Sequence, residues 1–115
     1  MAKTRADLVN RALYNLGVLP QGQTANAEDF NAVDALVDPM IEDLIGRDIV
    51  FVEDVDAIDE KYFLHLGHVL AGHAASIYGM QNDAALAAKM IKGEQDLQRL
   101  AATRPTYQTL EVQAY

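Results

Sequence analysis

Three histidines, His65, His68 and His73, are the side chains of this sequence best suited to proton transfer or metal binding. His65 and His68 are three residues apart, so on a helix they could share a face. A zinc site needs further ligands at fixed geometry, and the HExxH pattern is absent. We therefore predict no metal and no other cofactor. We interpret the histidines as partly buried polar residues at a contact between helices or subunits.

Carboxylates and the single serine offer two other kinds of chemistry. A two-carboxylate glycosidase needs one carboxyl in an apolar setting that faces a second across a cleft. Glu28, Glu42, Glu60 and Glu94 are present, but no pattern marks any of them as that acid. Ser76 lacks the nucleophile-elbow motif, and glycine-rich phosphate loops are absent. The sequence therefore predicts a protein that is not an enzyme.

Two charged segments could form contacts with partners. The acidic segment 53–60 lacks the glycine and the spacing of a calcium loop, so we interpret it as a solvated connection. A basic stripe near the end of the chain has spacings of three and seven residues, which place its members on one side of a helix. We expect an interface between subunits that uses the basic residues Lys89, Lys92 and Arg99 and the acidic residues Glu53, Asp54 and Asp56.

The last residues, 104–115, differ from the helical pattern before them. Pro105 prevents a helix from continuing, and the segment after it alternates in the manner of an extended strand. A lone strand presents unpaired backbone groups that can pair with a partner, and aromatic residues are common interface anchors. We therefore predict a docking tail with the partner-binding residues Arg104, Tyr107, Leu110, Val112 and Tyr115.

Length and composition limit the class of protein. A chain of 115 residues that is 50% hydrophobic makes one domain with a real core. The chain has no cysteine, and neither a signal peptide nor a membrane-spanning run is expected, so we predict an intracellular soluble protein. The net charge is −8, from 9 basic and 17 acidic residues, which disfavours sequence-independent nucleic-acid binding as the main function.

Apolar periodicity predicts helices over about 5–16, 27–46, 59–78 and 82–103, with Asn82 as the cap of the last one. Pro39 lies inside the second, and either a kink or two shorter helices would accommodate it. The unbroken apolar pattern favours a kink. Residues 49–52 form a short apolar run typical of an extended segment or brief strand. We predict an all-α, four-helix bundle-like domain over residues 1–103, with a kinked second helix and an extended C-terminal arm over 104–115.

The opening of the chain resembles a known family. Residues 4–18 read TRADLVNRALYNLGV, followed by a breaker-rich loop and the acidic-apolar helix that leads to residues 40–44. This opening is similar to that of the head-to-tail adaptor (connector) proteins of tailed bacteriophages, such as the tail accessory factor of short-tailed phages. At the level of pattern the resemblance covers most of residues 4–103.

The resemblance implies a structural virion protein at the head-tail junction, assembled in the cytoplasm of the bacterial host. Such adaptors form a dodecameric ring beneath the portal protein, extend the DNA channel and give the tail or nozzle protein a surface to attach to. Their C-terminal extensions reach onto the portal, which implies that role for residues 104–115 here. DNA would pass through the channel without specific binding, and no membrane would be involved.

Two alternatives remain open. The basic stripe could belong to a small helical DNA-binding or genome-packaging protein, since DNA-reading helices carry such residues. The second alternative is a carboxylate-dependent cell-wall hydrolase, which would use one of the glutamates.

Overall fold

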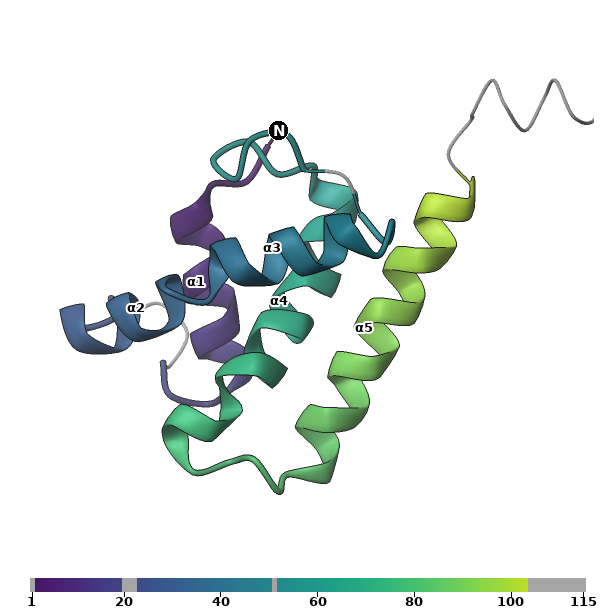
Figure 1. Cartoon of the computed structure of the whole chain (residues 1–115). Coiled ribbons are helices and arrows are strands. Elements are labelled where there is room, and N and C mark those ends of the chain that lie inside the picture. The colour runs from purple at the N-terminus through teal and green to yellow at the C-terminus, as the bar shows by residue number, and fades with distance from the viewer. Residues whose placement is uncertain (1, 20–22, 51, 104–115) are drawn as a thin grey trace, which may run out of the picture.

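A computed structural model describes residues 2–19, 23–50 and 52–103, and their regular structure is helical (Figure 1). The all-α prediction is therefore confirmed for these residues. Within them, β-pairing is limited to one isolated antiparallel bridge between Lys3 and Ile58. The predicted C-terminal arm lies outside the described residues. The helices are α1 (Arg5–Asn15), α2 (Ala27–Asp34), α3 (Val37–Gly46), α4 (Glu60–Ala74), the 3-10 helix η1 (Ala75–Tyr78) and α5 (Ala84–Thr103).

Helix α1 begins where the sequence predicts, because Thr4 and Asp7 form a capping box. The Thr4 Oγ1 accepts a hydrogen bond from the Asp7 backbone N–H (3.1 Å), and the Thr4 N–H donates to the Asp7 carboxylate (3.0 Å). Two backbone donors that have no partner inside the helix are thereby satisfied. The buried side of α1 consists of Leu8, Val9, Ala12 and Leu13.

The predicted kink in the second helix is wrong, because the structure has two helices, α2 and α3, separated by Ala35 and Leu36. Pro39 consequently lies in the first turn of α3, where a missing N–H removes no intrahelical bond. The apolar register nevertheless continues across the break. Its buried members are Val33, Val37, Met40, Ile41 and Leu44.

Three further local details correct the expectations. The helix predicted over 59–78 is α-helical only to Ala74 and ends as the 3-10 helix η1. The cap of α5 is Asp83 and not Asn82, because the Asp83 carboxylate accepts hydrogen bonds from the backbone N–H groups of Ala85 and Leu86. In segment 49–52, the described residues form no strand, and Ile49 and Val50 are buried in the core.

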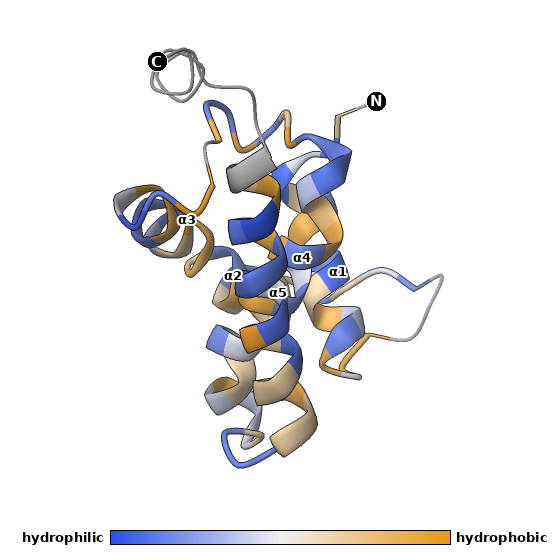
Figure 2. Ribbon diagram, turned by 90° about the vertical axis from the view of Figure 1, so that its right-hand side faces the viewer, coloured by the Kyte–Doolittle hydropathy of each residue, from blue (hydrophilic) through white to orange (hydrophobic). Residues whose placement is uncertain are grey.

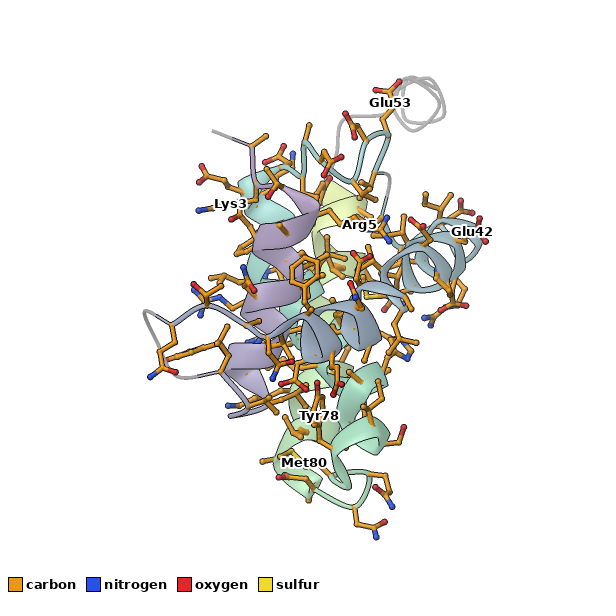
Figure 3. All side chains as sticks on the ribbon, turned by 90° about the vertical axis from the view of Figure 1, so that its left-hand side faces the viewer. Lys3, Arg5, Glu42, Glu53, Tyr78 and Met80 are labelled. Carbon is orange, nitrogen blue, oxygen red and sulfur yellow. The ribbon has the colours of Figure 1, made fainter. Side chains whose placement is uncertain are left out.

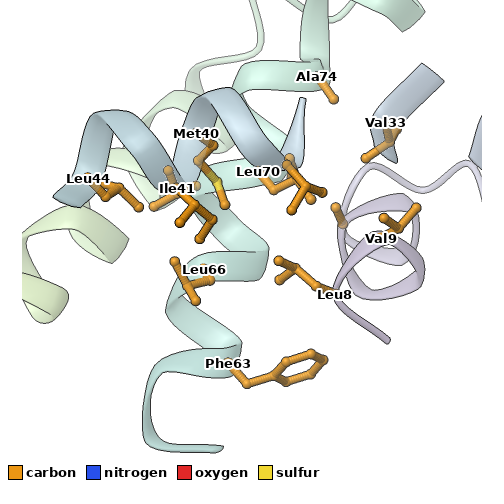
Figure 4. Close-up of a cluster of buried hydrophobic side chains, with 14 of the residues drawn as sticks. Leu8, Val9, Val33, Met40, Ile41, Leu44, Phe63, Leu66, Leu70 and Ala74 are labelled. Carbon is orange, nitrogen blue, oxygen red and sulfur yellow. The ribbon is translucent and has the colours of Figure 1, made fainter. Parts of the chain in front are cut away.

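The helices form a layer with a crossing pair on one side. Helix α4 lies between α1 and α5 and packs against both, while α3 runs across α4 (Figures 1 and 2). A regular four-helix bundle is therefore not confirmed. In the core, Leu66 and Leu70 of α4 face Met40 and Ile41 of α3, and Leu8 of α1 closes the cluster (Figure 4). We call the side of this layer away from α3 the open face.

Two glycines provide a matched test of the backbone conformation. Gly17 ends α1 with φ of +79°, whereas Gly46 ends α3 without a positive φ, and a Cβ at either position would meet open space. We expect Gly17→Ala to lower the free energy of unfolding by about 1 kcal/mol, because alanine is strained at positive φ. Gly46→Ala should raise it by about 0.5 kcal/mol through helix propensity. Urea unfolding measures both, and equal effects would contradict the conformations described.

Candidate functional site

The predicted docking residues Arg104, Tyr107, Leu110, Val112 and Tyr115 lie outside the described residues. The described structure does locate the end of α5, from which this segment continues. That end lies on the same side of the molecule as the N-terminus and the acidic loop (Figures 1 and 2). The remaining predicted surfaces are the basic stripe of α5 and the acidic loop.

The basic stripe lies on one side of α5 and surrounds Asp96. The Lys92 Nζ lies 3.5 Å from the Asp96 carboxylate, and the Arg99 Nη1 lies 3.1 Å from it. The Asp96 side chain is only 17% exposed, whereas those of Lys92 and Arg99 are more than 70% exposed. Both cations therefore remain available to solvent, although Asp96 partly neutralises them.

Two of the histidines extend this surface onto α4. The His65 Nδ1 lies 3.6 Å from the Asp96 carboxylate of α5, and the His68 Nδ1 lies 3.5 Å from the Asn15 amide nitrogen of α1. Both rings are partly buried at helix contacts, as predicted. His73 differs, because it is exposed beside α3.

Arg11 is a member of this region that the sequence patterns did not reveal. Burial lowers the pKa of His68, and the positive charges of Lys89, His65 and Arg11 lower it further. Arg11 of α1 and Lys89 of α5 therefore both act on one imidazole of α4. We define the cationic face as the charged side chains Arg11, Lys89, Lys92 and Arg99 together with the imidazoles of His65 and His68 on α4, of which His68 is neutral at physiological pH because its pKa is lowered.

The acidic loop contributes mainly to the local structure. The Asp54 carboxylate accepts a hydrogen bond from the Asp56 backbone N–H (2.9 Å), and the Asp56 carboxylate accepts one from the Arg5 N–H (3.4 Å). Glu53 is exposed at the end of the molecule (Figure 3). The ion pairs of Lys92 and Arg99 run to Asp96 and not to this loop, so any contact between the two predicted surfaces would have to form between subunits.

Arg5 connects α1 to both α2 and α3. Its Nε lies 2.6 Å from the Asp34 carboxylate, its Nη1 lies 2.8 Å from that of Asp38, and its Nη2 donates to the Asp34 backbone carbonyl (3.0 Å). The hydrogen bonds to Asp34 and Asp38 raise the pKa of Arg5. Arg5 therefore fixes the position of the α2–α3 break and is a structural residue.

Tyr78 provides a second polar connection within the fold. Its hydroxyl donates a hydrogen bond of 3.0 Å to the Asp29 carboxylate, which ties η1 to the first turn of α2. Burial, together with this hydrogen bond to the Asp29 carboxylate, raises the pKa of Tyr78 to about 12. The tyrosine is therefore neutral at physiological pH and acts as a structural donor.

The hollows lined by described residues are small. Three hollows in the described part of the chain have volumes of about 140, 170 and 180 Å³, whereas small-molecule sites typically measure about 300–1,000 Å³. The largest of the three is mostly apolar and is lined by Leu36, Pro39, Met40, Asp43 and His73. Among the residues described, no group of three or more acidic or histidine side chains is placed to hold a metal ion.

The lowered pKa of His68 predicts the pH dependence of folding. Because the folded pKa lies below the unfolded value of about 6.5, the unfolded chain binds more protons between the two values. The folded state is therefore favoured above about pH 6.5 and loses that contribution as the pH falls toward the folded pKa. In urea unfolding at pH 7.5 and pH 5.5, His68→Gln should lose less stability than the wild type. An equal or larger loss in the variant would contradict this assignment.

No helix in the described part of the chain combines the length and the hydropathy required to cross a bilayer. Comparison of the chain with protein-family models, with curated proteins and with solved structures found no match.

Proposed function

We propose that this chain is a structural, non-enzymatic adaptor of a tailed bacteriophage. In this proposal it docks beneath the portal protein at the head-tail junction of the virion and forms a ring, dodecameric as in the family it resembles. The ring extends the DNA channel and presents a surface for the tail or nozzle protein. The C-terminal segment 104–115 attaches each copy to the portal.

One observation carries the proposal. The segment that resembles the family, residues 4–18, has a structural role in the described fold. Within residues 4–18, Thr4 and Asp7 cap α1, Arg5 connects α1 to α2 and α3, and Leu8 and Leu13 are fully buried. The residues on which the resemblance rests therefore include positions that cap, connect and fill the described fold, which supports the proposal.

The surface chemistry also favours a structural role. Thr4, Asp7 and Tyr78 cap or connect helices, and the three hollows described above are small for substrate binding. A net charge of −8 would repel the phosphates of DNA, so that DNA could pass through a channel without adhering to its wall.

The proposal is tested by mixing the purified chain with the cognate portal ring and sedimenting the mixture at physiological salt. The chain should sediment with the portal at one copy per portal subunit. A chain that stays in the supernatant even when both the chain and the portal are present at high concentration would overturn the proposal.

The cationic face favours one alternative, a small DNA-binding or genome-packaging protein. That function predicts salt-sensitive binding to duplex DNA, which the loss of Lys89 and Lys92 would weaken. A fluorescence-anisotropy titration with duplex DNA distinguishes the two functions, because the adaptor is expected to show negligible binding at physiological salt.

A further inference from the structure

The cationic face lies on the open face of the layer. On α4, Leu66 and Leu70 point toward α3, and residues about half a turn away point in the opposite direction. Leu64 and His68 are such residues, and Leu64 is 54% exposed. On α5, Glu94 contacts Arg47 near α3, so the stripe of Lys89 and Lys92 lies on the other edge of the helix.

Two helices, α1 and α5, contribute positive charge to this surface, and both pack against α4. The Arg11 side chain packs on Gly67 of α4, where a Cβ would lie 2.7 Å from its Cγ. The charge of Lys89 on α5 also acts on the His68 imidazole, because it lowers the pKa of that group. Neither Arg11 nor Lys89 forms an ion pair with the residues that the structure describes. Their charges are therefore free to meet an external partner.

The same surface carries apolar groups. Tyr14 is 43% exposed, and the Arg11 guanidinium lies 5.2 Å from the centroid of its ring. Leu64 adds an exposed aliphatic side chain to the face. Tyrosine and arginine are typical anchors of protein interfaces, and an exposed leucine adds nothing to binding a phosphate backbone. The chemistry therefore favours an acidic protein surface over nucleic acid.

The opposite side of the molecule has the complementary charge. Segment 27–46, which forms α2 and α3, contains no lysine or arginine. Glu42 projects from the side of α3 away from α1 (Figure 3). We define the acidic face by the exposed carboxylates of these two helices, which are Glu28, Asp38, Glu42 and Asp43. Arg5 and Arg47 pair with Asp38 and Asp43, so Glu28 and Glu42 supply the negative charge that is not paired within the described residues.

We infer that the cationic face docks against the acidic face of a second copy of this chain. Because the two faces differ, the contact is head-to-tail, and such contacts generate rings or open filaments. The acidic face is a better partner than the loop at 53–56, because Glu28 and Glu42 form no ion pair with the residues that the structure describes, whereas Asp54 and Asp56 accept hydrogen bonds within their own chain. The inference deepens the proposed function and rests on it for the biological assembly.

Charge reversal on each face tests the contact directly. One full-length variant carries Lys89→Glu and Lys92→Glu, and the other carries Glu28→Lys and Glu42→Lys. Each variant alone has two faces of like charge, so its self-association in sedimentation velocity at low salt should be at least about tenfold weaker than that of the wild type. An equimolar mixture should associate again, because every contact between unlike variants pairs opposite charges.

A matched control separates the face from the net charge. Lys89→Gln with Lys92→Gln changes the charge by the same amount as Gln95→Glu with Gln98→Glu, and all four positions are exposed on α5. The first pair should weaken self-association about tenfold, and the second pair, which lies outside the cationic face, should change it less than twofold. Circular dichroism confirms that each variant is folded.

Three outcomes would overturn the inference. They are a wild type that stays monomeric at every concentration, a mixture of the reversed variants that does not associate, and equal effects of the two matched pairs. A wild type that binds duplex DNA through Lys89 and Lys92 without self-association would assign the face to nucleic acid instead. Sedimenting the same variants with the portal ring distinguishes loss of the contact between copies from loss of docking to the portal.

Discussion

Deletion of residues 106–115 is expected to leave the helical domain folded while weakening its attachment to the portal by at least about a hundredfold. The domain should survive because, among the α5 residues up to 101, the last fully buried side chain is Leu97, and Leu100 is only partly buried. Attachment should fail because the deleted segment contains Tyr107 and Tyr115, and a few aromatic anchors commonly supply several kcal/mol of an interface.

Two measurements check this prediction. The urea midpoint of the truncated chain should match that of the full chain, and co-sedimentation with the portal should be lost. Tyr107→Ala and Tyr115→Ala together should reproduce most of the loss, whereas Thr109→Ala serves as a control of similar position. A truncated chain that fails to fold would show that the tail belongs to the core, and one that still sediments with the portal would remove the tail from the docking site.

Replacement of Gly72 by leucine is expected to lower the free energy of unfolding by about 3 kcal/mol, the upper part of the usual range for overpacking. A Cβ at this position would lie 2.6 Å from the Met90 Cβ and 2.7 Å from its Cγ, so α5 would have to move away from α4. Since α5 packs mainly against α4, a shift there loosens the whole helix. A total stability of about 5–15 kcal/mol is typical of such domains, so the loss should be easily measured.

The control for this variant is Ala88→Leu, which adds a leucine at an exposed position of α5 and should change stability by less than about 0.5 kcal/mol. Combining Gly72→Leu with Met90→Ala should recover about half of the loss, because the shortened side chain leaves space for the leucine. Urea unfolding of the wild type, Gly72→Leu, Met90→Ala and the double variant gives the interaction energy between the two positions. Equal stabilities of Gly72→Leu and Ala88→Leu would show that the two helices do not pack as described.

The parts of the fold that depend on local rules could be predicted from the sequence. Thr4 and Asp7 identify the start of α1, because a capping box involves only neighbouring residues. The interruption before Pro39 could not be located, since the apolar period continues from Val33 through Val37 to Met40 as if one helix were present. Apolar periodicity indicates which side of a helix is buried, but it does not show where the run of helical backbone hydrogen bonds ends.

The same distinction applies to the candidate surface. Lys89, Lys92 and Arg99 could be recognised because they lie on one helix at helical spacing. Arg11 could not, since it joins them only when α1 packs against Gly67 of α4. Asp96 is similar, because its sequence position gives no sign that it also lies beside His65.

The most direct test of the account is the mass of the complex between the full chain and its cognate portal ring, measured by native mass spectrometry. The adaptor function predicts that the mass rises by one 12.6 kDa chain for each portal subunit and that the occupied state contains a complete ring. A portal ring whose mass does not change in the presence of excess chain would contradict the account.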